Sequence, residues 1–264
     1  MNPPSNTGFT FSRGAFVARM DADDEAYPKR LEQQLHFLEN NPDYGAVGGL
    51  AEYSSNEPFR GFKTYVSWVN SVRSYRAILR KQFIDSPIVN PTAMWRKTTA
   101  EKHGLYKDSD FPEDYEMWLR WLHQGVKIAK IPEFVLKWND SANRLTRTHN
   151  IYSDEAFYKI KTRYLSYWLE SNNPYHPHVM VWGASKISRK RAENLEQYGI
   201  VIDGYIDINS ARQINKPLYH YTELQPGEDQ FILIYVRQWH AKTAIETFLT
   251  QNKYQEGSHF LFIS

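Results

Sequence analysis

Apolar residues recur at helical spacing in three places in the first half of the chain. The pattern predicts a helix that begins near Pro28 and ends at Asn40, a second over 65–81, and a third from Pro112 to the stop at Gly125. Their expected apolar faces are Leu31, Leu35 and Leu38, then Trp68, Val72, Tyr75 and Leu79, then Tyr115, Trp118, Leu119 and Leu122. An extended run over 15–20 precedes the first helix and leads into a polar turn.

The last third of the chain has a different pattern. Four apolar runs predict buried strands, at 179–182, 200–206, 231–236 and 260–263. Helical patterns lie between the first two runs and between the last two, which predicts a parallel sheet with right-handed crossovers. A polar stretch with prolines over 172–177 reads as a linker. We therefore expect three regions: 1–150, a helical connection and linker over 151–177, and a small Rossmann-like α/β domain over 178–264.

The amino-acid composition excludes several kinds of site and partner. The chain has no cysteine, which excludes disulfides, thiolate catalysis and cysteine-bound zinc, so any metal must be held by oxygen or imidazole. The net charge of +2 is too small to predict a nucleic acid partner. No apolar run is long enough for a membrane helix. We expect a cytoplasmic protein. Peripheral association with the inner face of the membrane is compatible with this sequence.

The polar turn after the first strand contains Asp21, Asp23 and Asp24. Acidic residues before a helix often serve as caps or as first-turn charges, and Asp24 fits that reading. Two carboxylates that flank one small residue can also face a common point, where hard oxygens bind Mg²⁺ or Mn²⁺ together with substrate phosphates. The turn is therefore a candidate site for a metal and a diphosphate.

A second carboxylate pair, Glu113 and Asp114, begins the third helix. Both suit the positive end of the helix dipole, and one of them is equally placed to act as a general base toward a hydroxyl group. An acidic metal turn and a separate carboxylate pair on another element are what sugar transfer from a nucleotide-diphosphate sugar requires. The metal stabilises the leaving diphosphate while the base removes the proton of the incoming hydroxyl.

Two long runs carry a family resemblance. RGAFVARMDADDEAYPKRLEQQLHFLENNPDYGAVGG resembles the middle of family 2 glycosyltransferases, with their DXD-type motif, and NPTAMWRK followed by HGLYKDSDFPEDYEMWLRWLHQG resembles their acceptor-side segment with its ED motif. The resemblance implies a GT-A fold over the first 150 residues, inversion at the anomeric carbon and a divalent cation. The expected function is transfer of a sugar from a nucleotide-diphosphate donor to a glycan or lipid-linked acceptor in cell-surface polysaccharide synthesis.

The same resemblance implies roles for individual residues. Asp21 and Asp23 would bind the metal and the diphosphate, and Asp114 would be the catalytic base, with Glu113 beside it. His149 falls where some relatives supply a further metal or diphosphate contact, although a lone histidine is more often a surface or packing residue. Arg144 and Arg147 nearby are candidates for contact with phosphate.

The sequence departs from the family pattern in one respect. Family members begin with about 80 to 100 residues that hold the nucleotide base, roughly half of an α/β domain. Here the acidic turn arrives at Asp21, so we expect these 264 residues by themselves to bind donor poorly or not at all and to be impaired as an enzyme. The alternative is a non-catalytic module that associates with other proteins of a polysaccharide-synthesis complex.

The C-terminal region carries a partial nucleotide fingerprint. Only Gly183 fits the Gly-x-Gly-x-x-Gly pattern, because Ser185 and Ser188 replace the other glycines, while Asp207 follows the second strand where a ribose-binding acid is expected. A nicotinamide-dependent enzyme is thus a third hypothesis, and a Rossmann-like module without a ligand is the simpler reading.

Overall fold

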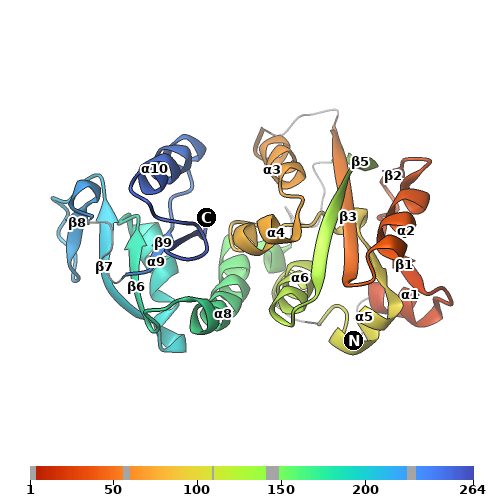
Figure 1. The fold of residues 1–264 in the computed structure, drawn as a ribbon, viewed down its shortest axis with the longest axis horizontal. Helices are drawn as coiled ribbons and strands as arrows, with labels where there is room; N and C mark the ends of the chain where they lie inside the picture. Colours follow the sequence, from red (N-terminus) through yellow and green to blue (C-terminus); the bar gives the residue numbers. More distant parts are fainter. Residues whose placement is uncertain (1–3, 56–59, 109, 141–148, 225–229) are drawn as a thin grey trace. The chain divides into compact units, whose positions relative to one another are not determined.

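The structure, a computed structural model, describes residues 4–55, 60–108, 110–140, 149–224 and 230–264. The chain forms two compact units, drawn in Figure 1 with the colours of the sequence. The first comprises Met1–Gln82 and Ser86–Phe157, and the second comprises Phe83–Asp85 and Tyr158–Ser264. The chain therefore contributes to the second unit twice, first through a short segment and then through its C-terminal part.

The first unit is built on a mixed five-stranded sheet in the order β1-β4-β3-β5-β2. The strands are β1 (Phe16–Ala18), β2 (Glu25–Ala26), β3 (Tyr44–Ser54), β4 (Met94–Arg96) and β5 (Lys127–Asn139). β3 and β5 run parallel, and the other neighbours pair antiparallel. The apolar pattern predicts only β1. Glycines in β3 and a proline in β5 interrupt the alternation that would reveal the two long strands.

Short helices pack around this sheet. They are α1 (Pro4–Phe11), α2 (Arg30–Asn40), α3 (Arg60–Ser71), α4 (Tyr75–Lys81), η1 (Asn90–Thr92), α5 (Lys97–His103), α6 (Glu113–His123) and η2 (Asn150–Tyr152). α6 packs through Trp118 and Trp121 against Trp95 of β4, with edge-to-face ring contacts at centroid distances of 5.5–6.2 Å. The predicted apolar face of α6 is confirmed. The buried tryptophans anchor α6 against β4.

The first predicted helix exists as α2, but its buried face differs from the apolar one. Arg30, Gln34 and Leu38 are buried, whereas Leu31 is 59% exposed. The polar side chains are tolerated inside because they meet backbone acceptors: Arg30 donates to the Arg19 carbonyl at 2.6 Å and Gln34 donates to the Thr92 carbonyl at 2.8 Å. These contacts tie α2 to the ends of β1 and β4.

The single helix predicted over 65–81 is wrong, because the structure has two. α3 ends at Ser71, and α4 begins after Ser74, whose Oγ accepts a hydrogen bond from the Ala77 amide at 3.2 Å. The carbonyl of Arg73, in the break, accepts instead from the amide of Lys130 on β5 at 2.9 Å. A serine cap and a bond to the sheet therefore replace one turn of helix.

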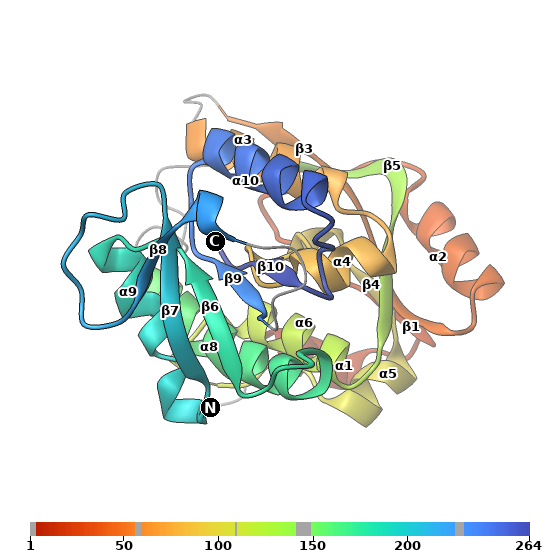
Figure 2. The ribbon, with the colours of Figure 1, turned by 60° about the vertical axis from the view of Figure 1, so that its left-hand side comes forward.

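The second unit contains an entirely parallel sheet in the order β10-β9-β6-β7-β8 (Figure 2). The strands are β6 (His178–Trp182), β7 (Val201–Asp207), β8 (Leu218–His220), β9 (Ile232–Ile234) and β10 (Phe260–Phe262). The helices are α8 (Asp154–Asn172), α9 (Lys186–Glu193), η3 (Glu196–Tyr198), η4 (Tyr221–Glu223) and α10 (Trp239–Gln251). The predicted parallel α/β class is confirmed; the apolar pattern did not reveal β8.

Helices cover both faces of this sheet. α10 packs through Ile245 and Leu249 against Trp182 and Ile234 on one face. On the other face Tyr158 of α8 stacks on Tyr235 and lies under the guanidinium of Arg191 from α9, at 4.1 Å from the ring centroid. No described helix has both the length and the apolar character needed to cross a bilayer.

The parallel pairing of β3 and β5 leaves no room for a side chain at Gly49. A Cβ there would lie 2.4 Å from Cγ1 of Val135, a β-branched residue that is fully buried. We expect Gly49→Ala to lower the free energy of unfolding by about 1–3 kcal/mol through overpacking. Urea unfolding followed by circular dichroism measures this.

Gly61→Ala in α3 is the matched control, because nothing lies within 4 Å of its Cβ position. Adding Val135→Ala to Gly49→Ala should recover part of the loss, since it removes the clashing methyl groups. Equal stability of Gly49→Ala and the wild type would contradict this account of the β3–β5 contact.

Candidate functional site

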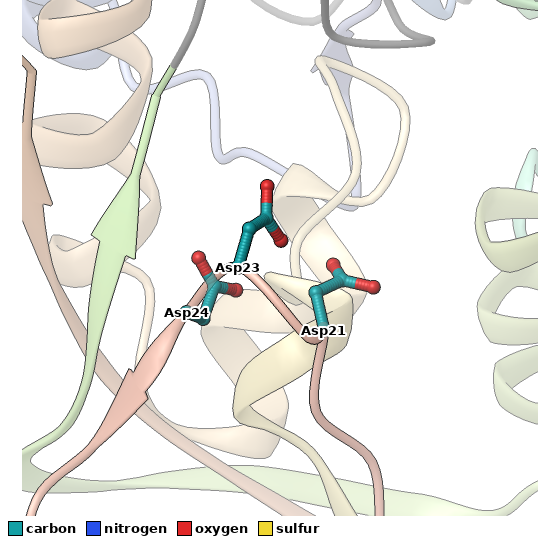
Figure 3. A group of neighbouring side chains, drawn as sticks. All are labelled: Asp21, Asp23 and Asp24. Carbon is teal, nitrogen blue, oxygen red and sulfur yellow. The ribbon is translucent and has the colours of Figure 1, made fainter.

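The acidic turn gathers three carboxylates at the end of β1. One oxygen from each of Asp21, Asp23 and Asp24 lies within 4.8 Å of the others (Figure 3). Asp24 is buried, Asp21 is half-buried and Asp23 is exposed. The Asp24 amide closes the turn on the Asp21 carbonyl at 3.3 Å. A hard divalent ion accepts this set of oxygen ligands.

Asn139, the last residue of β5, holds the turn in place. Its amide donates to Oδ1 of Asp24 at 3.0 Å, and its side-chain Nδ2 donates to the Asp23 carbonyl at 2.8 Å. The short strand β2, which follows the turn, pairs with β5 through Glu25 opposite Lys137. Asp24 is thus held against the backbone of β5 through its Oδ1.

Two arginines supply positive charge beside the turn. Nη1 of Arg19 forms an ion pair with Oδ2 of Asp21 at 2.6 Å. Burial disfavours the charge of Arg19, yet Asp21, Tyr106 and Asp114 outweigh that effect and raise its pKa. Burial lowers the pKa of Arg30 to about 10, partly offset by Asp24. The carboxylates are therefore partly neutralised by the protein itself.

Glu113 and Asp114 occupy the first turn of α6, after Pro112. Oδ1 of Asp114 accepts a hydrogen bond from the Tyr115 amide at 2.7 Å. Burial, reinforced by the neighbouring charge of Glu113, raises the pKa of Asp114 to about 7, against the opposing effects of this hydrogen bond and of Arg19. Both oxygens of Glu113 accept from the Tyr152 hydroxyl at 3.1 Å. The pKa of the Asp114 carboxyl therefore lies near neutral pH.

The acidic turn and the α6 carboxylates influence the same cation. Arg19 is bonded to Asp21, and its charge also acts on Asp114. Tyr106 and Tyr152 belong to the same electrostatic neighbourhood, because both the Asp114 and Arg19 charges act on their hydroxyls. Sequence reasoning missed Arg19, Asn139 and both tyrosines. Arg19 alone carried a signal, as a cation two residues before the acidic turn.

His149 is exposed and lies outside the carboxylate group. Its Nδ1 accepts from the Ile151 amide at 3.4 Å, so it caps η2. The same short segment provides Tyr152, which contacts Glu113. Arg144 and Arg147 lie outside the described residues. A role for His149 in metal binding stays a prediction.

In the second unit, the residues of the partial nucleotide fingerprint contact other parts of the protein itself. Gly183 has φ +118°, and a Cβ there would lie 3.3 Å from Oγ of Ser188. Oγ of Ser188 donates to the Tyr235 carbonyl at 3.0 Å. Asp207 accepts from the Ala184 amide at 2.7 Å and from the Asn209 amide at 3.0 Å. The acid that would hold a ribose is bonded to its own loops, which does not favour the nicotinamide hypothesis.

The raised pKa of Asp114 makes the stability of the fold depend on pH. The carboxyl is protonated in the folded protein up to about pH 7 but ionises near pH 4 in the unfolded chain, so its stabilising contribution is present at low pH and is lost as pH rises through 7. Asp114→Asn keeps the neutral form. We expect the variant to gain on the order of 1–2 kcal/mol over the wild type between pH 5 and pH 8.

Urea unfolding of both proteins at the two pH values measures this gain. Glu32→Gln, on the exposed side of α2, is a control for removal of one carboxylate. An Asp114→Asn difference that stays constant with pH would contradict the raised pKa.

Residues 5–104 match the family model described as glycosyl transferase family 2. This segment holds the acidic turn, Arg19 and strands β1 to β4, whereas Glu113 and Asp114 follow it. Relatives match a larger share of the chain than this model does. An uncharacterized glycosyltransferase of Haemophilus influenzae is 29% identical over 170 residues, which cover 62% of this chain and 52% of the relative.

Two further relatives have more specific names. The amylovoran biosynthesis glycosyltransferase AmsE of Erwinia amylovora is 24% identical over 59% of this chain and 58% of its own length. A UDP-Gal:alpha-D-GlcNAc-diphosphoundecaprenol beta-1,3-galactosyltransferase of Escherichia coli is 26% identical over 61% of this chain and 56% of its own length. The chain spans about half to three fifths of the length of these relatives.

Among solved structures, TarS of S. aureus in complex with UDP-GlcNAc aligns with a TM-score of 0.42 and 13% identity, over 74% of this chain and 50% of that chain. The family match, the relatives and the α/β sheet that presents the acidic turn agree with one another. Through residues 5–104 of its first unit, the chain is similar to glycosyl transferase family 2.

Proposed function

We propose that the first unit holds the metal turn and the catalytic base of an inverting glycosyltransferase. The enzyme would transfer a sugar from a nucleotide-diphosphate donor to a hydroxyl group of a saccharide or lipid-linked acceptor in polysaccharide synthesis. The observation that carries the proposal is the group of three carboxylates within 4.8 Å, inside the segment that matches the family. The names of the relatives support this class of donor and acceptor.

Asp21 and Asp23 would hold the ion, Mn²⁺ or Mg²⁺. Their oxygens suit a hard cation that keeps some positions for diphosphate oxygens, since such ions are usually bound by one or two carboxylates together with substrate phosphates. When bound, the ion would neutralise negative charge on the leaving diphosphate. Asp24 would contribute mainly by keeping the turn against β5, where the Asn139 amide contacts it.

Asp114 would be the base. General-base catalysis is most efficient when the pKa lies near the working pH, and burial beside Glu113 raises the pKa of Asp114 to about 7. The acceptor oxygen would attack the anomeric carbon and pass its proton to the Asp114 carboxylate, while the bond from that carbon to the diphosphate oxygen breaks. Attack from the side opposite the leaving group inverts the anomeric centre.

The hydrogen bonds of the two carboxylates favour Asp114 over Glu113 as the base. Both carboxylate oxygens of Glu113 accept a hydrogen bond from the Tyr152 hydroxyl. This contact engages the Glu113 carboxylate and orients it. Asp114 accepts the Tyr115 amide through Oδ1. Glu113 would therefore tune Asp114 through its charge, and Tyr152 would fix Glu113 in that position.

Asp114→Asn tests the base. The variant keeps the shape of the side chain but cannot accept the proton, so we expect transfer to fall by about 10²–10⁴-fold. Binding of a nucleotide sugar in the presence of Mn²⁺ should change little. The measurement is release of nucleoside diphosphate from UDP- and GDP-sugars, with this chain or any longer protein that contains it. Turnover at the wild-type rate would rule out Asp114 as the base.

Asp23→Asn tests the metal. The substitution removes one charged ligand without touching the hydrogen bond that the Asp23 carbonyl accepts from Asn139, so we expect Mn²⁺ affinity to fall about tenfold or more. Electron paramagnetic resonance of free Mn²⁺ during titration measures the affinity. Asp43→Asn, an exposed carboxylate paired with Lys127, is the control for nonspecific charge. Unchanged Mn²⁺ binding in Asp23→Asn would reduce the acidic turn to a structural cap.

A further inference from the structure

The second unit exposes large apolar side chains at one edge of its parallel sheet. Because all five strands run in one direction, the residues that follow them lie at the same edge. Ile187 in the first turn of α9 follows β6, Ile208 directly follows β7, and Trp239 begins α10 after β9. Their exposed fractions are 62%, 75% and 44%.

The three strands are neighbours. β6 pairs with β7 on one side and with β9 on the other, with Trp182 opposite both Ile206 and Ile234. The apolar residues therefore leave the sheet from adjacent strands, toward α9 on one face and α10 on the other. The Lys242 ammonium lies 4.5 Å from the centre of the Trp239 ring, which helps to hold this ring at the surface.

Positive charge accompanies these residues. Lys186, Arg212 and Arg237 are exposed in the segments that follow β6, β7 and β9. Within the described part of the same edge, the acidic residues are Asp85, Asp207 and Glu223. Asp85 belongs to the segment Phe83–Asp85, which lies beside Ile263 after β10, because Lys161 donates to the carbonyls of both Ile84 and Ile263. Asp207 accepts two backbone amides and lies 3.6 Å from Arg212, and Glu223 accepts the His220 amide at 2.9 Å. The exposed basic side chains thus outnumber the exposed acidic ones.

We propose that this carboxyl edge of the second unit docks on an anionic lipid bilayer. Such a membrane has an apolar interior and a negatively charged headgroup layer. The exposed isoleucines and tryptophan match the interior, and the neighbouring lysine and arginines match the headgroups. A small-molecule site would instead enclose its apolar residues in a concave pocket, whereas these side chains project into solvent. Tryptophan favours the depth at which lipid headgroups meet the acyl chains.

The charge arrangement favours lipid over a protein partner. Protein interfaces bury an apolar centre that is depleted in charge, but here a cation accompanies each apolar residue along the chain: Lys186 beside Ile187, Arg212 after Ile208 and Arg237 before Trp239. Each cation near an anionic membrane is worth about a fivefold gain in binding. Several weak contacts of this type produce reversible association with a membrane.

Co-sedimentation with vesicles tests the proposal. We expect the whole chain to bind vesicles in which about a third of the lipid is phosphatidylglycerol, to bind phosphatidylcholine vesicles much more weakly, and to be released as salt rises. Combined Ile187→Ser and Ile208→Ser should reduce binding about tenfold, and Lys186→Glu about fivefold or more. These side chains are exposed, so the fold should not change.

Matched controls lie at the opposite edge of the same sheet. Val201 is 40% exposed at the start of β7, and Lys253 is exposed beyond the end of α10. Val201→Ser and Lys253→Glu should bind as the wild type does. The proposal is overturned if the chain sediments with neither vesicle, if it binds both equally, or if the variants at the two edges lose binding to the same extent. The assay uses no sugar donor, so its result is separate from the proposed transfer.

Discussion

The geometry of the candidate site depends on a few hydrogen bonds between the acidic turn and the end of β5. The Asn139 amide binds the Asp24 carboxylate, and the Asn139 side chain binds the Asp23 carbonyl. Three carboxylates held close together repel one another, so the turn requires bonds that stabilise this conformation. β5 can provide them because it pairs in parallel with β3 through the centre of the sheet.

Positive charge offsets the same repulsion. Arg19 bonds directly to Asp21, while Arg30 is buried under the turn and donates to the Arg19 carbonyl. A buried guanidinium is costly unless its hydrogen bonds and nearby charges compensate for lost water. Arg30 obtains both in part: its Nη2 donates to backbone oxygens and the charge of Asp24 acts on it, whereas its Nη1 is buried without a hydrogen-bond partner. The buried polar face of α2 therefore belongs to the support of the acidic turn rather than to the apolar core.

In the second unit, hydrogen bonds to the backbone also hold polar side chains at the end of a sheet. Its parallel sheet brings the ends of β6, β7 and β9 to one edge, where Gly183 turns sharply above Ser188. Side chains that could have bound a nucleotide are engaged with the backbone, Asp207 with two amides and Ser188 with the Tyr235 carbonyl. This edge is internally hydrogen-bonded, and apolar and basic side chains project from it.

The sequence by itself determined the local features. Periodicity revealed the apolar face of α6 and the parallel α/β class of the second unit, because both follow from repeats of a few residues. The close grouping of Asp21 with Asp23 also follows from their spacing along one turn. Their proposed roles, and that of Asp114, came from resemblance to a family.

Only the tertiary structure decided which distant groups meet. Asn139 reaches the turn from 115 residues away, Arg19 acts on both Asp21 and Asp114, and Phe83–Asp85 joins the second unit. Leu31 is exposed while Arg30 is buried, which reverses what hydrophobicity predicts. These outcomes depend on strand order and register, and on which backbone groups lack partners inside the fold. Neither is encoded in the spacing of neighbouring residues.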